Sequence, residues 1–538
     1  MIDPDTQKNL IKMLFIALFL MITVAMDITA GIYVLQWWEP SRIVYLILIQ
    51  IVNLGIAYEL TEWILAFVVK KRDLPKLPSL KRHPPVAVLY LTCNDFIPTL
   101  ASRLKALTYP NLAVFVLDDS TQTEDRHQID RCGLPVVRRK TRSDFKAGNL
   151  NHWLRHHSRD FDYFIVLDND SLIPDNFVEE MVKYAEHEVN HDVAIFQSSV
   201  GIWNQDNRFA RTLDLVRSLR MFVSERIDNP CESLLPTTNV LVRTAAIQAV
   251  GGFATRSRTT EDWETGLEVI AQGYRCQRVD VPSYVSMSTS ARMHTHRMTR
   301  WACGTLEIVK SGIKNVPLTT NLRLLMAIYF YMIWPVYIAG LIFLTIWGYH
   351  STWDDLRILT HLTRHGHLWQ GPLVYPSLFV LAYFIYFLIL RPLLAYWMGI
   401  PLRAYLSFVL AVSAVGFYAF APLLKGQMLI LLGKRPRREA LALEPPVVTV
   451  RGLLKEMRLS MFMLGIILVG LVRNPLAIVL NFLWLIPLFL SPFVLYLWQR
   501  PTVQCYPESE TTWQANEEER SFDDTTITCL HHPPLLRR

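Results

Sequence analysis

The chain has 538 residues, of which 51% are hydrophobic and only 19% are charged, and it contains 15 tryptophans. Soluble domains carry about 25% charged residues, so the apolar residues here must be concentrated in segments that see little water. This composition excludes a disordered chain, a secreted disulfide scaffold and a purely cytosolic enzyme. The net charge of +7 is weak evidence for nucleic-acid binding, and we expect no nucleic-acid partner.

Long apolar runs near both ends of the chain predict membrane-spanning helices, each of which needs about 20 mostly apolar residues. The runs are Met13–Leu35, Ile43–Val69, Leu324–Trp347, Val374–Tyr396 and Pro475–Trp498, with a shorter one at Leu459–Val472. A second run directly follows the first, so we interpret the first as a retained helix and not as a signal peptide. Glu59 and Glu62 lie inside the second run, where they either line a glycan channel or hydrogen-bond a neighbouring helix.

Basic residues orient these helices, because cytoplasmic loops are enriched in Lys and Arg. Lys70–Arg72 place the region up to about residue 320 in the cytoplasm, and Lys434–Arg438 require the same side for their loop. We therefore expect the apolar run Ala404–Leu424 to be interfacial or re-entrant, since a spanning helix there would put this loop outside. The expected protein is a multi-pass protein of the plasma (inner) membrane with six spans, a cytoplasmic catalytic domain and lipid contacts.

Residues 73–320 have a different pattern, which predicts an α/β domain. Short β-branched runs alternate with helical stretches, an arrangement typical of a parallel, doubly wound sheet. The runs are Val86–Leu91, Ala113–Leu117, Tyr163–Leu167 and Val193–Gln197. Residues 1–72 and 321–500 contain the membrane and interfacial helices, and the polar tail 501–538 is expected to be a disordered cytoplasmic segment.

Acidic residues follow two of the predicted strands directly. Asp118 and Asp119 come after one strand, and the sequence Asp168-Asn169-Asp170 comes after another. Carboxylates at positions i and i+2 of a strand end can face one pocket and bind a divalent ion through oxygen ligands. One such motif is weak evidence, since acidic turns are common, but two at strand ends of one domain favour a binding site.

Three further motifs carry polar chemistry. The KAGN sequence at 146–149 offers a lysine to a phosphate and a glycine that admits a ligand, although an ordinary helix start explains it equally well. The TED sequence at 260–262 contains an aspartate that can act as the general base for a sugar hydroxyl. The tryptophan of RMTRW at 297–301 is, taken alone, more typical of an interfacial anchor than of a substrate platform.

Taken in order, these motifs resemble those of the processive, membrane-embedded family 2 glycosyltransferases: cellulose synthase catalytic subunits and the hyaluronan, chitin and curdlan synthases. That family has a TxNE-like strand end, then DD, KAGN, DxD, TED and QxxRW. This chain has TCND at 92–95, DD at 118–119, KAGN at 146–149, DND at 168–170, TED at 260–262 and RMTRW at 297–301. The resemblance covers about residues 10–500 and implies a GT-A-like α/β nucleotide-sugar domain inserted in a multi-spanning α-helical membrane domain, with a glycan channel in the helices after residue 320.

The resemblance also implies a role for each matching residue. The nucleotide sugar would be bound by Thr92, Asp95, Asp119, Lys146, Asp168 and Arg300. Mg²⁺ or Mn²⁺ would be held by Asp168 and Asp170 beside the diphosphate. Asp262 would deprotonate the acceptor hydroxyl in a single inverting displacement. The growing glycan acceptor would contact Trp301, Arg297 and Glu261.

The function expected from this resemblance is a processive, inverting, metal-dependent hexosyltransferase. It would polymerise a β-glycan from a UDP-sugar, with UDP-glucose and a cellulose-like or β-1,3-linked glucan as the best guess. The product would leave through the protein's own membrane channel, alone or with accessory export subunits. A tail too short for a PilZ-type domain gives no reason to expect regulation by cyclic-di-GMP through this chain.

Two alternatives remain open at this point. Arg297 and Met298 stand where the family has Gln followed by Gln or Arg, and this difference leaves the acceptor and the linkage undetermined. It somewhat favours a non-processive transferase that adds one sugar to a lipid or short glycan acceptor. A third interpretation is a transporter with a nucleotide-sensing domain, against which the intact Asp168, Asp170 and Asp262 argue.

Overall fold

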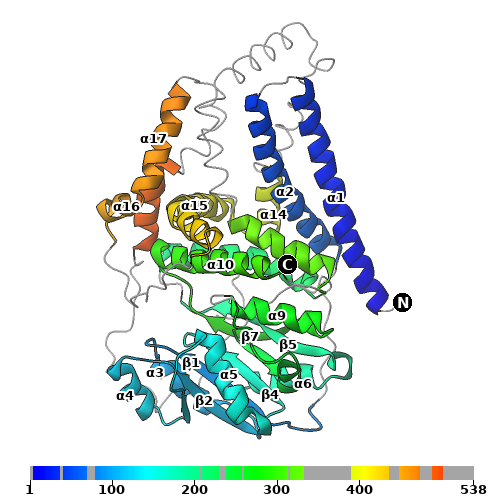
Figure 1. Ribbon diagram of the computed structural model, residues 1–538, viewed down its shortest axis with the longest axis vertical. Coiled ribbons are helices and arrows are strands. Elements are labelled where there is room, and N and C mark those ends of the chain that lie inside the picture. The colour runs from blue at the N-terminus through cyan, green and yellow to red at the C-terminus, as the bar shows by residue number, and fades with distance from the viewer. Residues whose placement is uncertain are drawn as a thin grey trace.

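The computed structural model describes residues 4–36, 40–69, 79–204, 207–229, 238–256, 260–312, 315–331, 389–434, 448–472 and 488–500. An α/β domain occupies one end of the molecule and long apolar helices occupy the other, with α10 and α15 between them (Figure 1). The predicted spans that begin at Leu324, Val374 and Pro475 each include residues outside the described part of the chain.

Seven strands form one mixed sheet in the order β3-β2-β1-β4-β6-β5-β7. Their bounds are β1 Val86–Thr92, β2 Leu112–Asp118, β3 Val136–Arg138, β4 Tyr163–Leu167, β5 Val193–Ile202, β6 Val240–Arg243 and β7 Arg275–Val285. The four predicted strands are confirmed, but the all-parallel sheet is wrong, since β6 runs antiparallel to β4 and β5. A strand of four residues is too short to reveal itself by periodicity.

Helices cover both faces of this sheet. The helices of this part of the chain are α3 Pro98–Arg103, α4 Thr123–Arg131, α5 Phe145–His157, α6 Phe177–Ala185, α7 Arg208–Ile227, α8 Thr244–Ala249, α9 Glu261–Ala271 and α10 Ala291–Ser311, with short 3-10 turns at Leu104–Ala106, Ser158–Asp160 and Glu188–Asn190. Of these, α7 and α10 pack against α15. Alternate residues of β1 enter two cores: Val88 packs with residues of α3 and α6, and Leu89 packs with residues of α5 and α8. All seven residues of β1 are buried for this reason.

The remaining described helices are α1 Pro4–Gln36, α2 Pro40–Val68, α14 Arg391–Trp397, α15 Leu402–Leu431, α16 Val450–Glu456 and α17 Arg458–Val472, with further helical segments at 318–331 and Leu488–Gln499. Among the described residues, two helices are long and apolar enough to cross a membrane, Thr6–Ile28 and Leu402–Leu431. In Figure 1, α1, α2 and α17 run along the long axis of the molecule, whereas α15 lies across it over α10. The interfacial placement of Ala404–Leu424 stays a prediction.

The helices α10 and α15 are in close contact. Met298 of α10 packs against the buried side of α15. Gly426 permits the approach, since a Cβ atom there would lie 2.9 Å from the Thr299 methyl group. Further along, the Lys310 ammonium donates a hydrogen bond of 2.8 Å to the carbonyl of Ile430. The helix α10, which carries the RMTRW motif, is therefore fixed to the apolar helix α15.

A largely buried network of charged groups joins α2 to the α/β domain, with Arg220 as its exposed member. Glu62 of α2 is paired with Arg220 of α7 and with Arg323, whose Nη2 lies 3.3 Å from Glu62 Oε1. The same Nη2 atom lies 2.8 Å from Asp228 Oδ1, and Asp228 also pairs with Arg278 of β7 at 3.1 Å. Glu62 thus bonds to neighbouring elements, which is the second of the two roles considered for it.

Replacement of Asp228 by Ala should destabilise the protein strongly. The change removes the carboxylate that Arg278 and Arg323 share in a buried environment, and breaking a buried pair costs about 3–5 kcal/mol. Asp192→Ala is the matched control, because its pair with Arg275 is partly exposed and is expected to contribute less than about 1 kcal/mol. Thermal unfolding of both variants in the same detergent tests this, and equal melting temperatures would contradict it.

Candidate active site

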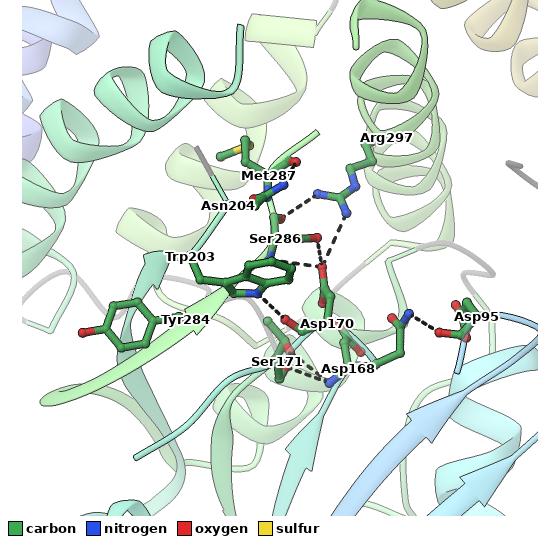
Figure 2. Close-up of polar contacts among 12 residues, drawn as sticks. Asp95, Asp168, Asp170, Ser171, Trp203, Asn204, Tyr284, Ser286, Met287 and Arg297 are labelled. Carbon is green, nitrogen blue, oxygen red and sulfur yellow. Dashed lines mark hydrogen bonds and ion pairs between the residues drawn. The ribbon is translucent and has the colours of Figure 1, made fainter. Parts of the chain in front are cut away.

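The carboxyl ends of β1, β2 and β4 meet at one edge of the sheet. The register pairs Thr92 with Asp118, and Tyr90 with Leu167, so the turns that follow these strands are neighbours. The Asn169 side chain joins two of the turns by donating a hydrogen bond of 2.8 Å to the Asp95 carbonyl (Figure 2). Three motifs that are far apart in the sequence are thus brought together at the edge where α/β folds bind ligands.

The loop after β1 is held closed by its own side chains. Asn94 adopts a left-handed conformation with φ of 61°, and its Oδ1 accepts hydrogen bonds from the backbone N–H groups of Thr121 at 2.7 Å and Gln122 at 3.0 Å. Asp95 Oδ1 accepts a bond of 3.0 Å from the Thr92 hydroxyl. The two predicted donor-binding residues of this loop, Thr92 and Asp95, are therefore in direct contact.

The two aspartates after β2 have different partners. Asp118 is buried and its Oδ2 lies 2.6 Å from Arg138 Nε. Asp119 is paired through both oxygens with Arg139, at 2.8 Å to Nε and 2.6 Å to Nη2. Bidentate pairs of this kind fix side-chain geometry well. The orientation of Asp119, a predicted donor-binding residue, is therefore set by an arginine that the sequence analysis did not single out.

The KAGN motif forms the first turn of α5. Lys146 Nζ lies 2.7 Å from Asp168 Oδ1, so this turn reaches the acidic turn after β4. A Cβ atom on Gly148 would lie 2.0 Å from the Ser143 carbonyl oxygen and 2.4 Å from Arg139 Nη1. The glycine thus makes room for the loop that positions Arg139, which differs from the expectation that it admits a ligand.

The helix α5 also organises the loop before the TED motif. Two residues with left-handed backbone stand at its start, the N-cap Asp144 with φ of 56° and the first helical residue Phe145 with φ of 44°. Such strain in residues other than glycine is typical of functional sites. At its second turn, the Asn151 amide accepts a bond of 2.7 Å from the backbone N–H of Phe253 and donates one of 2.8 Å to the Phe253 carbonyl. One helix therefore connects three of the predicted motifs.

Asp170 is held from three sides (Figure 2). Its Oδ2 accepts a hydrogen bond of 2.5 Å from the Ser286 hydroxyl and lies 3.7 Å from Arg297 Nη2. The indole N–H of Trp203 donates a bond of 2.9 Å to the backbone carbonyl of Asp170. The acidic turn after β4 is thus anchored to the ends of β5 and β7 and to α10.

Lys146 lies among three carboxylates. Burial lowers the pKa of Lys146, but the charges of Asp168, Glu261 and Asp262 outweigh this effect and raise the pKa overall. Burial raises the pKa of Asp168, and the Lys146 ammonium more than reverses this, so the net shift is downward. The pKa of Asp170 is raised, first by burial and then by the charge of Asp168. Asp168 is therefore the more firmly ionised of the two.

The TED motif begins α9. Glu261 is only 8% exposed, and within the described residues its Oε2 atom has no hydrogen-bond partner. Burial and the neighbouring charge of Asp262 raise the pKa of Glu261 to about 7, against the opposite effects of Lys146 and Arg300. Asp262 is partly exposed beside it, so one carboxyl of the motif is withdrawn and the other is accessible.

The residues of the RMTRW motif point to different surroundings. Arg297 pairs with the acidic turn after β4, and Met298 packs on α15. Arg300 lies close enough to the TED motif to affect the Glu261 carboxyl. Trp301 follows Arg297 by one helical turn and is 41% exposed. Arg297 thus contacts the predicted metal-binding turn, and Trp301 is left open for a ligand.

Asp168 and Asp170 could hold a divalent cation. Among the described residues, no group of three or more His, Cys, Asp or Glu side chains could do so. A pair of carboxylates nevertheless fits Mg²⁺ or Mn²⁺, because such ions commonly take their other ligands from water and substrate phosphates. The ion pairs of these residues use Oδ1 of Asp168 and Oδ2 of Asp170, so each side chain retains a second oxygen.

Four residues that hold the site together were not predicted from the sequence. They are Asn94, Arg139, Trp203 and Ser286, which follow β1, β3, β5 and β7 within two residues. A search for side chains with hydrogen-bonding groups directly after every strand could have found them. Two of those strands, β3 and β7, were themselves not predicted, so their ends could not be searched.

The raised pKa of Glu261 predicts a pH-dependent stability. Between its ordinary value of 4.5 and about 7 the folded protein keeps a proton that the unfolded chain has released, so the free energy of unfolding falls as pH rises through this window. Glu261→Gln should remove this pH dependence, which amounts to about 3 kcal/mol in the free energy of unfolding across the window. Melting temperatures between pH 4.5 and 8 measure it, with Glu124→Gln on exposed α4 as control. A slope identical to that of the wild type would contradict the prediction.

Comparison with known families shows what part of the chain is similar to. Residues 163–424, from β4 into α15, match the family described as Glycosyl transferase family group 2. Cellulose synthase 2 of Novacetimonas hansenii is 26% identical over 290 residues, which cover 51% of this chain and 17% of that protein. Cellulose synthase 1 catalytic subunit (UDP-forming) of Komagataeibacter xylinus is 26% identical over 254 residues, covering 43% and 33%. The chain therefore spans a third or less of the length of these relatives.

One solved structure that the comparison matched is the mannosyltransferase PcManGT from Pyrobaculum calidifontis in complex with GDP-Man and Mn²⁺. It matches with a TM-score of 0.45 and 19% identity, covering 62% of this chain and 98% of that one. The family match includes the DND, TED and RMTRW motifs. Residues 163–424 therefore match a family 2 glycosyltransferase domain, and the chain is similar in sequence to cellulose synthase catalytic subunits.

Proposed function

We propose that this glycosyltransferase is a processive, inverting enzyme that builds a β-glycan from a UDP-sugar and exports it between its own membrane helices. The convergence of Lys146 with two acidic pairs, Asp168 with Asp170 and Glu261 with Asp262, is the observation that carries the proposal. UDP-glucose is the proposed donor and a cellulose-like or β-1,3-linked glucan the proposed product, since relatives in sequence are named as cellulose synthases.

The donor is proposed to lie along the carboxyl edge of the sheet. Thr92, Asp95 and Asp119 would hold the uridine, because their loops are closed and their side chains fixed by hydrogen bonds. Lys146 and Arg300 would lie near the diphosphate, where cations stabilise phosphate oxygens. A divalent ion held by the acidic turn after β4 supplies positive charge that offsets the charge on the departing diphosphate.

Asp262 is proposed as the catalytic base. Its carboxylate takes the proton of the acceptor hydroxyl while that oxygen bonds to the anomeric carbon and the bond from this carbon to the diphosphate oxygen breaks. One displacement inverts the anomeric centre, so an α-linked donor gives a β-linked product. Glu261, with its pKa raised to about 7, can stay protonated beside Asp262 and avoids two adjacent negative charges.

The acceptor is proposed to approach along α10, which lies between the sheet and the long helices (Figure 1). The exposed ring of Trp301 offers a flat surface for a sugar, and the charge of Arg300 on the same helix acts on the Glu261 carboxyl. The growing chain would pass between the membrane helices of a multi-pass protein whose catalytic domain is cytoplasmic. Lipids and accessory export subunits are the further proposed partners.

A transferase that adds a single sugar is favoured by one observation. Arg297 is directed at Asp170, so the residue at this motif position is not presented to an acceptor beside Trp301. An enzyme without that acceptor contact would release its product after one addition. The size of the product distinguishes the two functions directly.

Asp262→Asn should abolish sugar transfer without removing the donor. General-base catalysis contributes about a hundredfold or more to the rate, whereas the amide keeps the size and shape of the side chain. The assay follows UDP release and product length with purified protein in lipid, Mg²⁺ or Mn²⁺, and a panel of labelled UDP-sugars. UDP binding by the variant should stay within about twofold of the wild type.

Asp125→Asn on exposed α4 is the matched control and should be as active as the wild type. Long, glycanase-sensitive polymer from one donor supports the synthase, and short or lipid-linked product supports the single-addition enzyme. Undiminished release by Asp262→Asn would refute the assignment of the base.

A further inference from the structure

The pairing of Arg297 with Asp170 has a consequence for metal binding. The Arg297 guanidinium spans two acceptors: its Nη2 lies 3.7 Å from Asp170 Oδ2, and its Nη1 donates a bond of 3.4 Å to the Ser286 carbonyl (Figure 2). Asp170 is one of the two carboxylates that fit a divalent ion. A cation of the protein therefore already neutralises a group that the metal needs.

The two acidic residues of this turn are neutralised unequally. Lys146 lies 2.7 Å from Asp168, which is a close charge-assisted hydrogen bond. Arg297 lies a full ångström further from Asp170, and its side chain is 34% exposed. Arg297 is thus the more weakly held cation, and its guanidinium has solvent into which it can move.

The backbone that carries Arg297 is much less free. The next residue, Met298, packs on α15, and Thr299 lies against Gly426 of the same helix. Displacement of Arg297 must therefore occur by rotation of its side chain, while α10 stays in place. A flexible guanidinium on a fixed helix suits a counter-ion that is exchanged during binding.

We propose that Arg297 couples divalent-metal binding to nucleotide binding at the proposed active site. Without nucleotide, Arg297 neutralises Asp170 and repels a divalent ion that approaches the same carboxylate. A bound nucleoside diphosphate offers the displaced guanidinium new anionic partners, so the metal then binds without losing that ion pair. The metal and the nucleotide consequently raise each other's affinity by the same factor. The proposal rests on the function proposed above.

A neutral residue at this position removes the competition. Glutamine is neutral and keeps a polar end, so Arg297→Gln tests the contribution of the charge. The variant should bind Mn²⁺ about tenfold more tightly than the wild type when no nucleotide is present, because one positive charge near the ion is gone. With saturating UDP the two proteins should differ little, so the coupling factor falls about tenfold.

Electron paramagnetic resonance measures the concentration of free Mn²⁺ in a titration of the full-length protein in lipid. The titration is done once without UDP and once with it. Arg292→Gln is the matched control: it lies on the same helix, carries the same change of charge, and pairs with Glu456 at 4.0 Å. It should bind Mn²⁺ as the wild type does. Arg297→Lys keeps the charge and should retain most of the coupling. Unchanged melting temperatures verify that each variant is folded.

The outcomes separate this proposal from the proposed function. Equal Mn²⁺ affinities of the wild type and Arg297→Gln without UDP, with binding lost in Asp168→Asn, would overturn the coupling by Arg297 and leave the metal site intact. Mn²⁺ binding that Asp168→Asn does not weaken would overturn the metal site and this proposal together. Tighter binding by Arg297→Gln, accompanied by a reduced effect of UDP, is the supporting result.

Discussion

The ion pair between Lys146 and Asp168 is the interaction on which the site depends. Carboxylates from the turns after β1 and β4 and from the start of α9 converge at one edge of the sheet, where they would repel one another and resist burial. Lys146 projects from the first turn of α5 into this group and is stabilised by Asp168, Glu261 and Asp262 together. This partly buried cation thus allows the acidic turns and the start of α9 to occupy the same small space.

The helix α10 connects this chemistry to the apolar part of the protein. One side of it presents Arg297 to the acidic turn, and the other packs on α15 through Met298. Its N-terminus is fixed by Gln499, whose side chain accepts a hydrogen bond of 2.9 Å from the Ala291 backbone N–H. The buried pairs of Glu62 and Asp228 make a second connection between the long helices and the sheet. The domain and the helices are thus joined at more than one place.

Much of the fold followed from short-range patterns. Buried strands such as β1 and β4 are continuous apolar runs, since helices cover both faces of the sheet, and the acidic turns after them mark their ends. The strand β6 escaped detection because four residues carry no periodicity. The pairing of Asp119 was not predicted either, since nothing in the local sequence tells which distant arginine lies within 2.6 Å of it.

The sequence by itself determined the class of domain, the order of its motifs and the residue types available for chemistry, because these depend on local propensity and on spacing along the chain. Only the tertiary structure decided how those residues are paired: Lys146 with Asp168, Arg139 with Asp119, and Arg297 with Asp170. The physical reason is that an ionic interaction is set by distance in space and by burial. Residues 127 positions apart, such as Asp170 and Arg297, become neighbours only when the sheet and α10 are packed together.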